Sequence, residues 1–381
     1  MRDNTVDAFF ALVRAGLWSD GNPEIRIDGT TDWQEVYRLA TEQSVLGLVL
    51  SGLEQYKNLN ANLNLNQMLL LQWIGEVQMI EQQNKDMNVF LANLVEKMRS
   101  AGIYTLLVKG QGVAQCYENP LWRSCGDIDL FLSDDNYEKA KTFLAPLATS
   151  IDREGEHEKH LGMTIDSWVV ELHGRLYCGL SSRIEKELDD IYRDTFFGGS
   201  VRSWNNDNVY VFLLSVENDA FYVFTHILQH FYKGGIGLRQ ICDWCRLLWT
   251  YRESLNPELL ESRIRRAGIM SEWKAFGAFA VEYLGMPADA VPLLDVRSLK
   301  EDVRWRKKAD RICDFIMKVG NMGHNRNSSY YVKYPYVIRK VFSFSRRLGD
   351  LYRHARIFPL DSFRFLPSIV FNGVRSAING E

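Results

Sequence analysis

The sequence predicts an α+β protein in which a mixed sheet core is flanked by N-terminal and C-terminal helical domains. Apolar residues recur at helical spacing through residues 1–100. Short runs with strand-like alternation then share residues 101–205 with helical segments. Helical spacing returns over residues 206–381. We therefore expect three domains with these boundaries, of which the central one is the α+β core.

The N-terminal domain is expected to consist of helices. Residues 1–18 place apolar side chains on one helical face, and the charged residues among them argue against a signal peptide. Asp32 can cap a helix that begins at Trp33, because its carboxylate can accept the free N–H groups of the first turn. A long helical pattern covers residues 67–100, and Gly102 follows where a left-handed residue commonly ends a helix.

The central domain contains three predicted strands and one predicted helix. The strands are expected over residues 103–108, 126–132 and 167–172, and the helix over residues 136–146. In the third strand, alternation puts Glu171 and His173 on the face opposite Leu172. His157 and His160 precede this strand in a charged segment, which we expect to be a solvated loop.

The C-terminal domain is expected to be helical as well. The predicted helices cover residues 209–232, 238–251, 257–268, 272–284 and 301–319. The tail over residues 332–380 is basic and aromatic. It could bind RNA or an anionic surface, or it could bury an apolar stripe and leave its cations in water.

The composition favours a globular, cytoplasmic protein. The chain has 381 residues, of which 46% are hydrophobic and 24% are charged, so it can bury a large core. Six cysteines do not make a disulfide scaffold in a chain of this length. The net charge of −3 argues against the global basic field of non-specific nucleic-acid binders. No run reaches the about 20 apolar residues that span a bilayer.

Two aspartates in the second predicted strand suggest a metal site. Asp127 and Asp129 lie on one face of that strand, about 7 Å apart, because strand side chains alternate. Two carboxylates held this close repel each other unless a cation offsets their charge. Oxygen ligands of this kind select Mg²⁺ or Mn²⁺. The alternative is an acidic pair at a solvated strand edge.

The first predicted strand ends in a glycine-rich turn. This turn is the run Lys109-Gly110-Gln111-Gly112, and glycines after a strand let the backbone approach phosphate oxygens closely. Arg123 lies between the turn and the aspartates. Lys109 and Arg123 could therefore neutralise phosphate charge, although each could also be an ordinary surface cation.

This arrangement resembles the nucleotidyltransferase superfamily related to DNA polymerase beta, and more closely the family of uncharacterised bacterial nucleotidyltransferases. The resemblance is carried by Lys109-Gly110, Tyr117, Arg123 and the run from Gly126 to Leu130. It extends to Glu171-Leu172-His173, to His226-x3-His230, to Gly235-Ile236-Gly237-Leu238-Arg239 and to Asp243. One departure is that the superfamily's Gly-Gly or Gly-Ser pair is Gly110-Gln111 here, which leaves open which turn residue contacts phosphate.

The resemblance implies a nucleotidyltransferase-like fold and a metal-dependent transfer of a nucleoside monophosphate from an NTP, with ATP favoured, to a hydroxyl, releasing pyrophosphate. The implied metal ligands and catalytic residues are Asp127, Asp129 and Glu171, with Glu171 as either ligand or base. Lys109, Gly110, Gln111, Gly112 and Arg123 are the implied nucleotide contacts. His173, His226, His230, Arg239 and Asp243 are candidate contacts to acceptor or nucleotide, although Arg239 and Asp243 could simply pair with each other.

The acceptor stays open among a small molecule, a protein and tRNA, and the acidic net charge favours the first two over nucleic acid. One alternative function is a nucleotide-binding or interaction protein that does not turn over. A second alternative is a zinc-stabilised helical scaffold, because His226, His230, Cys242 and Cys245 have the spacing of zinc ligands. In apolar helices, however, such cysteines commonly behave as small hydrophobic residues.

Overall fold

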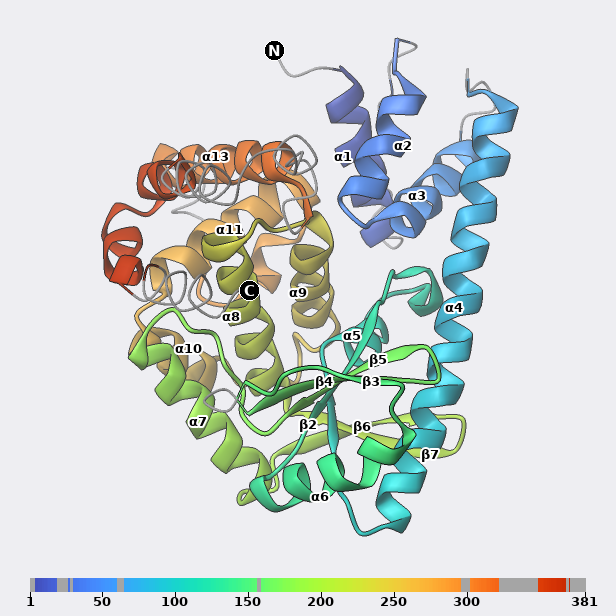
Figure 1. Ribbon diagram of the computed structural model, residues 1–381. Helices are drawn as coiled ribbons and strands as arrows, with labels where there is room; N and C mark the ends of the chain where they lie inside the picture. The colour runs from blue at the N-terminus through green and yellow to red at the C-terminus, as the bar shows by residue number, and fades with distance from the viewer. Residues whose placement is uncertain are drawn as a thin grey trace, which may run out of the picture.

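The computed structural model describes residues 4–18, 27, 30–59, 65–155, 159–295, 302–321, 349–367 and 370. In this part of the chain, helices surround a seven-stranded mixed sheet, and one long helix runs along the side of the molecule (Figure 1). The predicted α+β fold class is confirmed.

The strands of the sheet are β1 (Leu106–Val108), β2 (Asp127–Phe131), β3 (Ser150–Ile151), β4 (His160–Ile165), β5 (Trp168–His173), β6 (Val201–Asn206) and β7 (Val209–Leu214). They lie in the order β3-β4-β5-β2-β1-β7-β6, so the sheet has β5, β2 and β1 at its centre. Strand β2 pairs antiparallel with β1 and parallel with β5. Neighbours on both sides therefore hold β2 in a defined register.

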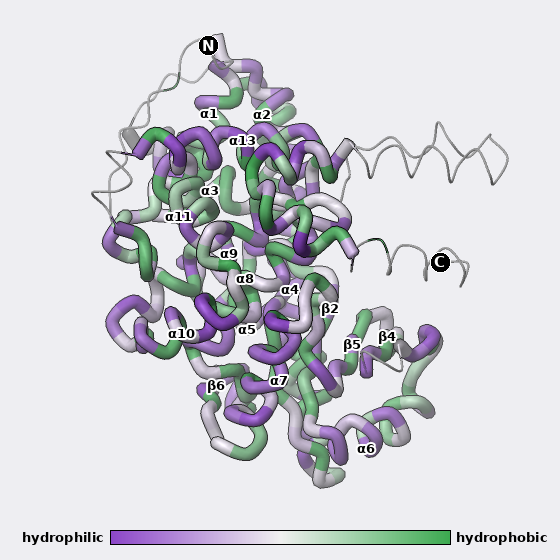
Figure 2. The backbone as a smooth tube through the Cα atoms, turned by 90° about the vertical axis from the view of Figure 1, so that its left-hand side faces the viewer, coloured by the Kyte–Doolittle hydropathy of each residue, from purple (hydrophilic) through white to green (hydrophobic). Residues whose placement is uncertain are grey.

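The helices form two groups around the sheet. Before the first strand come α1 (Asn4–Leu17), α2 (Trp33–Glu42), α3 (Leu46–Leu59) and α4 (Gln67–Ser100). Within and after the sheet come α5 (Gly110–Ala114), α6 (Asp134–Leu144), α7 (Ser182–Phe196), α8 (Val216–Lys233), α9 (Leu238–Thr250), α10 (Pro257–Ala267), α11 (Met270–Leu284) and α13 (Val303–Val319). Figure 2 shows hydrophilic and hydrophobic residues alternating along many of these helices, as expected where one side is buried.

Alternation along the strands gives the sheet two apolar faces. One face carries Leu130 and Leu172, which pack in a core with residues of α4 and α6. The other face carries Val108 and Phe131, which join a core that includes α8. Asp129 lies two residues before Phe131 and therefore projects toward the second face, on the side of α8.

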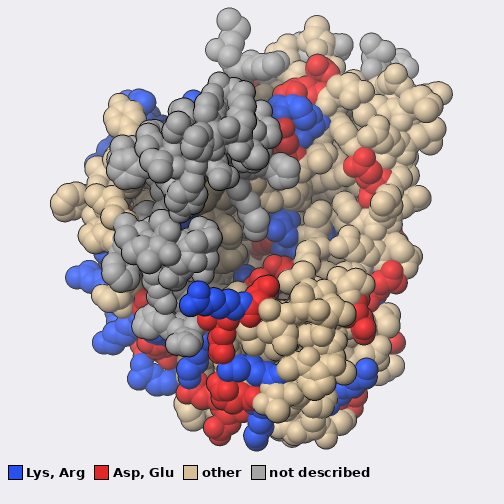
Figure 3. Space-filling model, viewed as in Figure 1, with Lys and Arg blue, Asp and Glu red and all other residues tan. Residues whose placement is uncertain are grey.

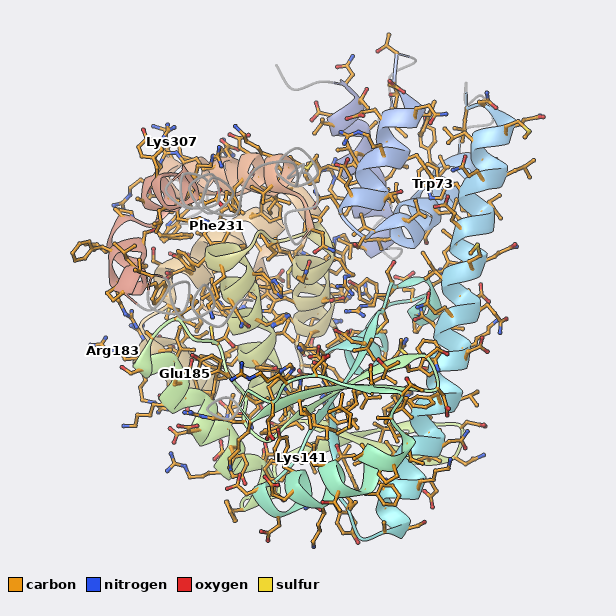
Figure 4. The ribbon with its side chains drawn as sticks, viewed as in Figure 1. Trp73, Lys141, Arg183, Glu185, Phe231 and Lys307 are labelled. Atoms are coloured by element: carbon orange, nitrogen blue, oxygen red, sulfur yellow. The ribbon has the colours of Figure 1, made fainter. Side chains whose placement is uncertain are left out.

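Helix α4 links the two ends of the molecule. Its 34 residues make it about 50 Å long at 1.5 Å per residue. Trp73 lies near its start, where the indole donates a hydrogen bond to the Leu46 carbonyl of α3 (Figure 4). Met87 and Leu91 lie further along the helix and pack beneath the sheet. The helix ends as predicted, with Gly102 at a φ of 72°.

The N-terminal and C-terminal helices pack on each other. A Cβ atom at Gly52 of α3 would lie 2.1 Å from the Leu12 carbonyl oxygen, so glycine permits the close approach of α1 and α3. On its other side, α1 contacts the end of α11: the Trp18 indole donates a hydrogen bond to the Leu284 carbonyl at 2.6 Å. The three expected domain boundaries stay a prediction, because helix packing does not show which parts of the chain fold independently.

The predicted helix over residues 209–232 was wrong in its first part. Residues 209–214 form β7, and α8 begins only at Val216. Asp207 and Asn208 have φ values of 49° and 68°, and they form the tight turn that joins β6 to β7. This turn was the missed signal, because two consecutive left-handed residues favour a hairpin over a continuing helix.

Two further strand predictions are corrected. The first strand begins at Leu106 instead of residue 103, because the Tyr104 N–H donates to the Asn136 side chain at 2.9 Å and not to a neighbouring strand. His160 does not lie in a solvated loop but opens β4, opposite His173 of β5. His157 and most of the basic tail over residues 332–380 lie outside the described residues. In the described part of the chain, helices that could cross a membrane are absent.

Candidate active site

Three carboxylates lie on the same face of the sheet. Asp127 and Asp129 are two residues apart in β2, and Glu171 of β5 is the register partner of Asp129. Partners in adjacent strands project to the same side, so all three side chains face α8. Glu171 thus lies beside the two aspartates and not in a separate core.

Asp129 is buried and is held by Lys109 and His173. The Lys109 Nζ and the His173 Nε2 each lie 2.8 Å from its Oδ1. Burial alone would raise the pKa of Asp129, but the Lys109 ammonium and His173 hold it below its ordinary value. In turn, burial opposes the positive charge of His173, but Asp129 and Glu171 raise its pKa. These three side chains form one charged cluster.

Lys109 adopts a strained backbone conformation at this point. Its φ is 58° and its ψ is −144°, between the end of β1 and the start of α5. For a residue with a side chain, such a conformation costs on the order of 1–3 kcal/mol and is concentrated at functional sites. In this conformation the Lys109 ammonium reaches Asp129, and the resulting ion pair offsets the cost of the strained backbone.

Asp127 has less charge compensation than Asp129. Burial and the neighbouring Asp129 raise the pKa of Asp127, and Lys109 offsets this only in part. A carboxylate whose ionised form is disfavoured in this way would gain from a nearby cation. The donors of Asp127 and Asp129 are all oxygens, as Mg²⁺ and Mn²⁺ prefer.

Glu171 is flanked by two histidines. Its Oε2 lies 3.0 Å from the His160 Nε2 and 3.6 Å from the His173 Nε2. The hydrogen bond with His160 and the nearby His173 hold the pKa of Glu171 well below its usual range. One ligand atom from each of the three residues lies within 4.8 Å of the others, which is compatible with a shared metal ion.

The three residues that follow Lys109 in the glycine-rich turn have different surroundings. Gln111 is buried, and its Nε2 donates to the Asn84 side chain at 2.7 Å. A Cβ atom at Gly112 would lie 2.8 Å from a methyl group of Leu213, so this glycine lets α5 pack on β7. Gly110 has a φ of 43° and lies next to the Asp127 backbone. Of these three residues, Gly110 is the one that lies beside the strand of the two aspartates.

Arg123 and Asp243 form a buried ion pair. The guanidinium donates through Nε and Nη2 to the two carboxylate oxygens, at 3.0 and 2.6 Å. The Tyr117 hydroxyl also donates to this carboxylate, at 2.8 Å. Arg239 does not pair with Asp243 as considered above; its Nη1 donates to the Ser124 carbonyl instead. Burial and the charge of Arg123 lower the pKa of Arg239.

Helix α8 presents a row of side chains toward the carboxylates. Tyr222, His226 and His230 follow one another at intervals of four residues, and the Tyr222 ring centroid lies 5.9 Å from the Lys109 Nζ. The two histidine Nε2 atoms are 3.0 Å apart. Burial, helped by the charge of Lys109, lowers the pKa of His226 well below its ordinary value and that of His230 to about 4. Both rings are therefore neutral near pH 7.

The zinc set considered from the sequence is not assembled. Cys242 and Cys245 are fully buried in apolar surroundings. Among the described residues, the group with metal-ligand spacing consists of His160, Glu171 and His173 and contains neither cysteine. Sequence reasoning did not place His160 or Tyr222 in the site. The strand-like alternation after residue 160 could have indicated His160. The helical spacing, with Tyr222 four residues before His226, could have indicated Tyr222.

Comparison with known proteins identifies a family for most of the chain. Residues 29–285 match the model of a family described as uncharacterised nucleotidyltransferase. Among solved structures, an antigenic nucleotidyltransferase-like protein from Paracoccidioides brasiliensis is similar, with 11% identity and a TM-score of 0.34. That match covers 56% of this chain and 95% of the other. Curated proteins gave no match.

A mixed sheet with three carboxylates on one face, next to a lysine and a glycine-rich turn, defines a nucleotidyltransferase-like α+β protein. The family model spans more than half of the chain. The chain therefore belongs to the uncharacterised nucleotidyltransferase family.

Proposed function

We propose that this protein is a metal-dependent nucleotidyltransferase that moves a nucleoside monophosphate from an NTP, with ATP favoured, to a hydroxyl group. The observation that carries the proposal is the pair Asp127 and Asp129 beside the strained Lys109. Such a pair offers oxygen ligands for a cation, and Lys109 next to it offers a positive charge for phosphate.

The residues fit a divalent ion. Asp127 lacks full charge compensation, and Glu171 stays ionised beside Asp129. When bound, Mg²⁺ or Mn²⁺ would neutralise phosphate charge and favour ionisation of the acceptor hydroxyl. Asp127 and Asp129 would hold one ion, and Glu171 beside Asp129 would ligate a second.

Lys109 would exchange partners when the nucleotide binds. Its ammonium is 2.8 Å from Asp129, and binding of a cation to this carboxylate would release it toward the phosphates. Gly110 would let these phosphates approach the backbone because it has no side chain. Arg239 is close enough to Asp127 to influence its pKa and would add positive charge on the other side.

The transfer forms a bond from the acceptor oxygen to the α-phosphorus and breaks the bond from that phosphorus to the oxygen that leaves with pyrophosphate. The acceptor proton must pass to a base. His226 and His230 lie on the helix that faces the carboxylates and are neutral near pH 7, but burial keeps their pKa low and makes them weak bases. Glu171 is the alternative base, and its low pKa favours the ligand role instead.

The acceptor is proposed to be a small molecule or a protein. Lys and Arg side chains lie interspersed with Asp and Glu on the face shown in Figure 3. The net charge of −3 points the same way, because nucleic-acid binders usually carry a basic surface.

The proposal is tested by incubating the protein with each labelled NTP, Mg²⁺ or Mn²⁺, and cell extract, followed by mass spectrometry of nucleotidylated products. We expect a product with the wild type and a loss of at least about 1,000-fold with Asp127→Ala or Asp129→Ala, since both ligands act on the reacting phosphate. The matched control is Asp135→Ala, which removes an exposed carboxylate of α6. Equal activity of wild type and both active-site variants would refute the assignment.

A second candidate is nucleotide binding without turnover. It is favoured by the contacts of Lys109 and His173, which already satisfy Asp129 without a metal ion. Titration calorimetry of ATP with and without Mg²⁺ separates the two candidates when it is combined with the product assay. Mg²⁺-dependent binding without product from any acceptor mixture would support the second.

A further inference from the structure

We propose that His160, Glu171 and His173 form a nitrogen-containing site for a divalent transition-metal ion, next to the all-oxygen position of Asp127 and Asp129. The inference deepens the proposed function and rests on it for the ion's role in transfer. Binding of the ion itself is argued from the geometry of these residues.

The three side chains come from a fixed piece of backbone. His160 is the register partner of His173 across the antiparallel pair β4 and β5, and Glu171 lies two residues before His173. All three therefore project to the same face. The two imidazole centroids are 4.8 Å apart. The His160 Nε2 contacts the Glu171 Oε2 at 3.0 Å, whereas the His173 Nε2 contacts the Asp129 Oδ1 at 2.8 Å and lies 3.6 Å from the Glu171 Oε2.

The spacing of the donors is close to that of a metal centre. Tetrahedral ligands at about 2.1 Å from an ion lie about 3.4 Å from each other. The observed separations from the Glu171 Oε2 are 3.0 Å to His160 and 3.6 Å to His173. Asp129 places a further oxygen 2.8 Å from the His173 Nε2 and is available as a fourth ligand.

The donor set selects the metal. Two imidazoles with one or two carboxylates suit Zn²⁺, Co²⁺ or Mn²⁺, whereas Mg²⁺ prefers oxygen and water ligands. The position of Asp127 and Asp129 contains no nitrogen donor of its own. The two neighbouring positions are therefore expected to prefer different ions, with a transition metal at Glu171.

The site is also reachable from solvent. The side chain of His160 is 38% exposed and that of Glu171 is 28% exposed, whereas that of His173 is 11% exposed. An ion can thus enter past His160 and meet a buried second imidazole.

Co²⁺ is the probe, because its visible absorption reports nitrogen ligands without any need for turnover. Full-length protein is stripped with a chelator, dialysed and titrated with CoCl₂, and MgCl₂ is then added in excess. We expect one equivalent of Co²⁺ to give visible bands that excess Mg²⁺ does not abolish. His160→Ala and His173→Ala are expected to weaken Co²⁺ binding by at least about 100-fold.

Three further variants make the test specific. His160→Gln keeps a hydrogen-bond donor to Glu171 but is a poor metal ligand, so it should lose the bands as His160→Ala does. Lys159→Ala is the matched control, since it removes only a surface ion pair to Asp134 beside the site. Asp127→Asn should keep the bands. Circular dichroism of each variant checks the fold.

The proposal is overturned if the wild type shows no bands, or if His160→Gln binds Co²⁺ as well as the wild type does. The proposed function can fail separately. Intact Co²⁺ binding with no nucleotidylated product would count against transfer alone. Product formation that is supported by Mg²⁺ and unchanged in His160→Ala, without Co²⁺ bands, would count against the transition-metal site alone.

Discussion

Replacement of Asp127 by asparagine should stabilise the metal-free protein while it abolishes transfer. Asp127 and Asp129 are about 7 Å apart along β2, and two unit charges at that distance repel by about 2 kcal/mol at an effective dielectric constant of about 20. Lys109 cancels part of this repulsion, and Asp127 is partly exposed, so solvent screens more of it. We expect a gain of about 1 kcal/mol in the free energy of unfolding.

The pH dependence of this gain has a definite sign. The pKa of Asp127 is raised in the folded protein, so folding favours its protonated form. The stability that this proton contributes is present below the ordinary carboxyl pKa of 3.8 and is lost as the pH rises through the folded-state value. The asparagine variant should therefore match the wild type near pH 3.5 and exceed it near pH 7.5.

Thermal melts of chelator-treated protein provide the assay. For a chain of this size, 1 kcal/mol corresponds to a shift of about 2 °C in Tm. Addition of Mg²⁺ at ten times its dissociation constant should raise the stability of the wild type by about 1.4 kcal/mol and leave the variant almost unchanged. A metal-free variant that melts below the wild type at pH 7.5 would refute the charge argument, because Asp127 would then make a net favourable contact.

Two further predictions concern other buried charges, Glu272 and the pair Arg123 and Asp243. Burial and the neighbouring Asp361 raise the pKa of Glu272 to about 8, so wild-type stability should fall as the pH rises from about 4.5 to 8, by up to about 5 kcal/mol. Urea unfolding at pH 6 and pH 9 should show a flatter dependence for Glu272→Gln. For the pair Arg123 and Asp243, removal of either partner should cost about 3–5 kcal/mol, and the double variant Arg123→Met/Asp243→Leu should cost less than the sum. Additive losses in the double-mutant cycle would argue against a coupled pair.

Much of the helical framework could be predicted from local sequence. The bounds of α4 follow from its apolar spacing and from Gly102, and Asp32 caps α2 by accepting the N–H groups of Gln34 and Glu35. The strands were harder. The apolar run of β7 is compatible with either a helix or a strand. Only the tight turn that joins β6 to β7 identifies it as a strand.

The sequence alone determined that Asp127 and Asp129 share a face, because strand side chains alternate with a period of two whatever surrounds them. Tertiary structure alone decided which residues meet them. Register between β2 and β5 sets Glu171 beside Asp129, and pairing of β4 with β5 brings in His160. Strand register depends on contacts between segments far apart in the chain, and no local pattern specifies those contacts.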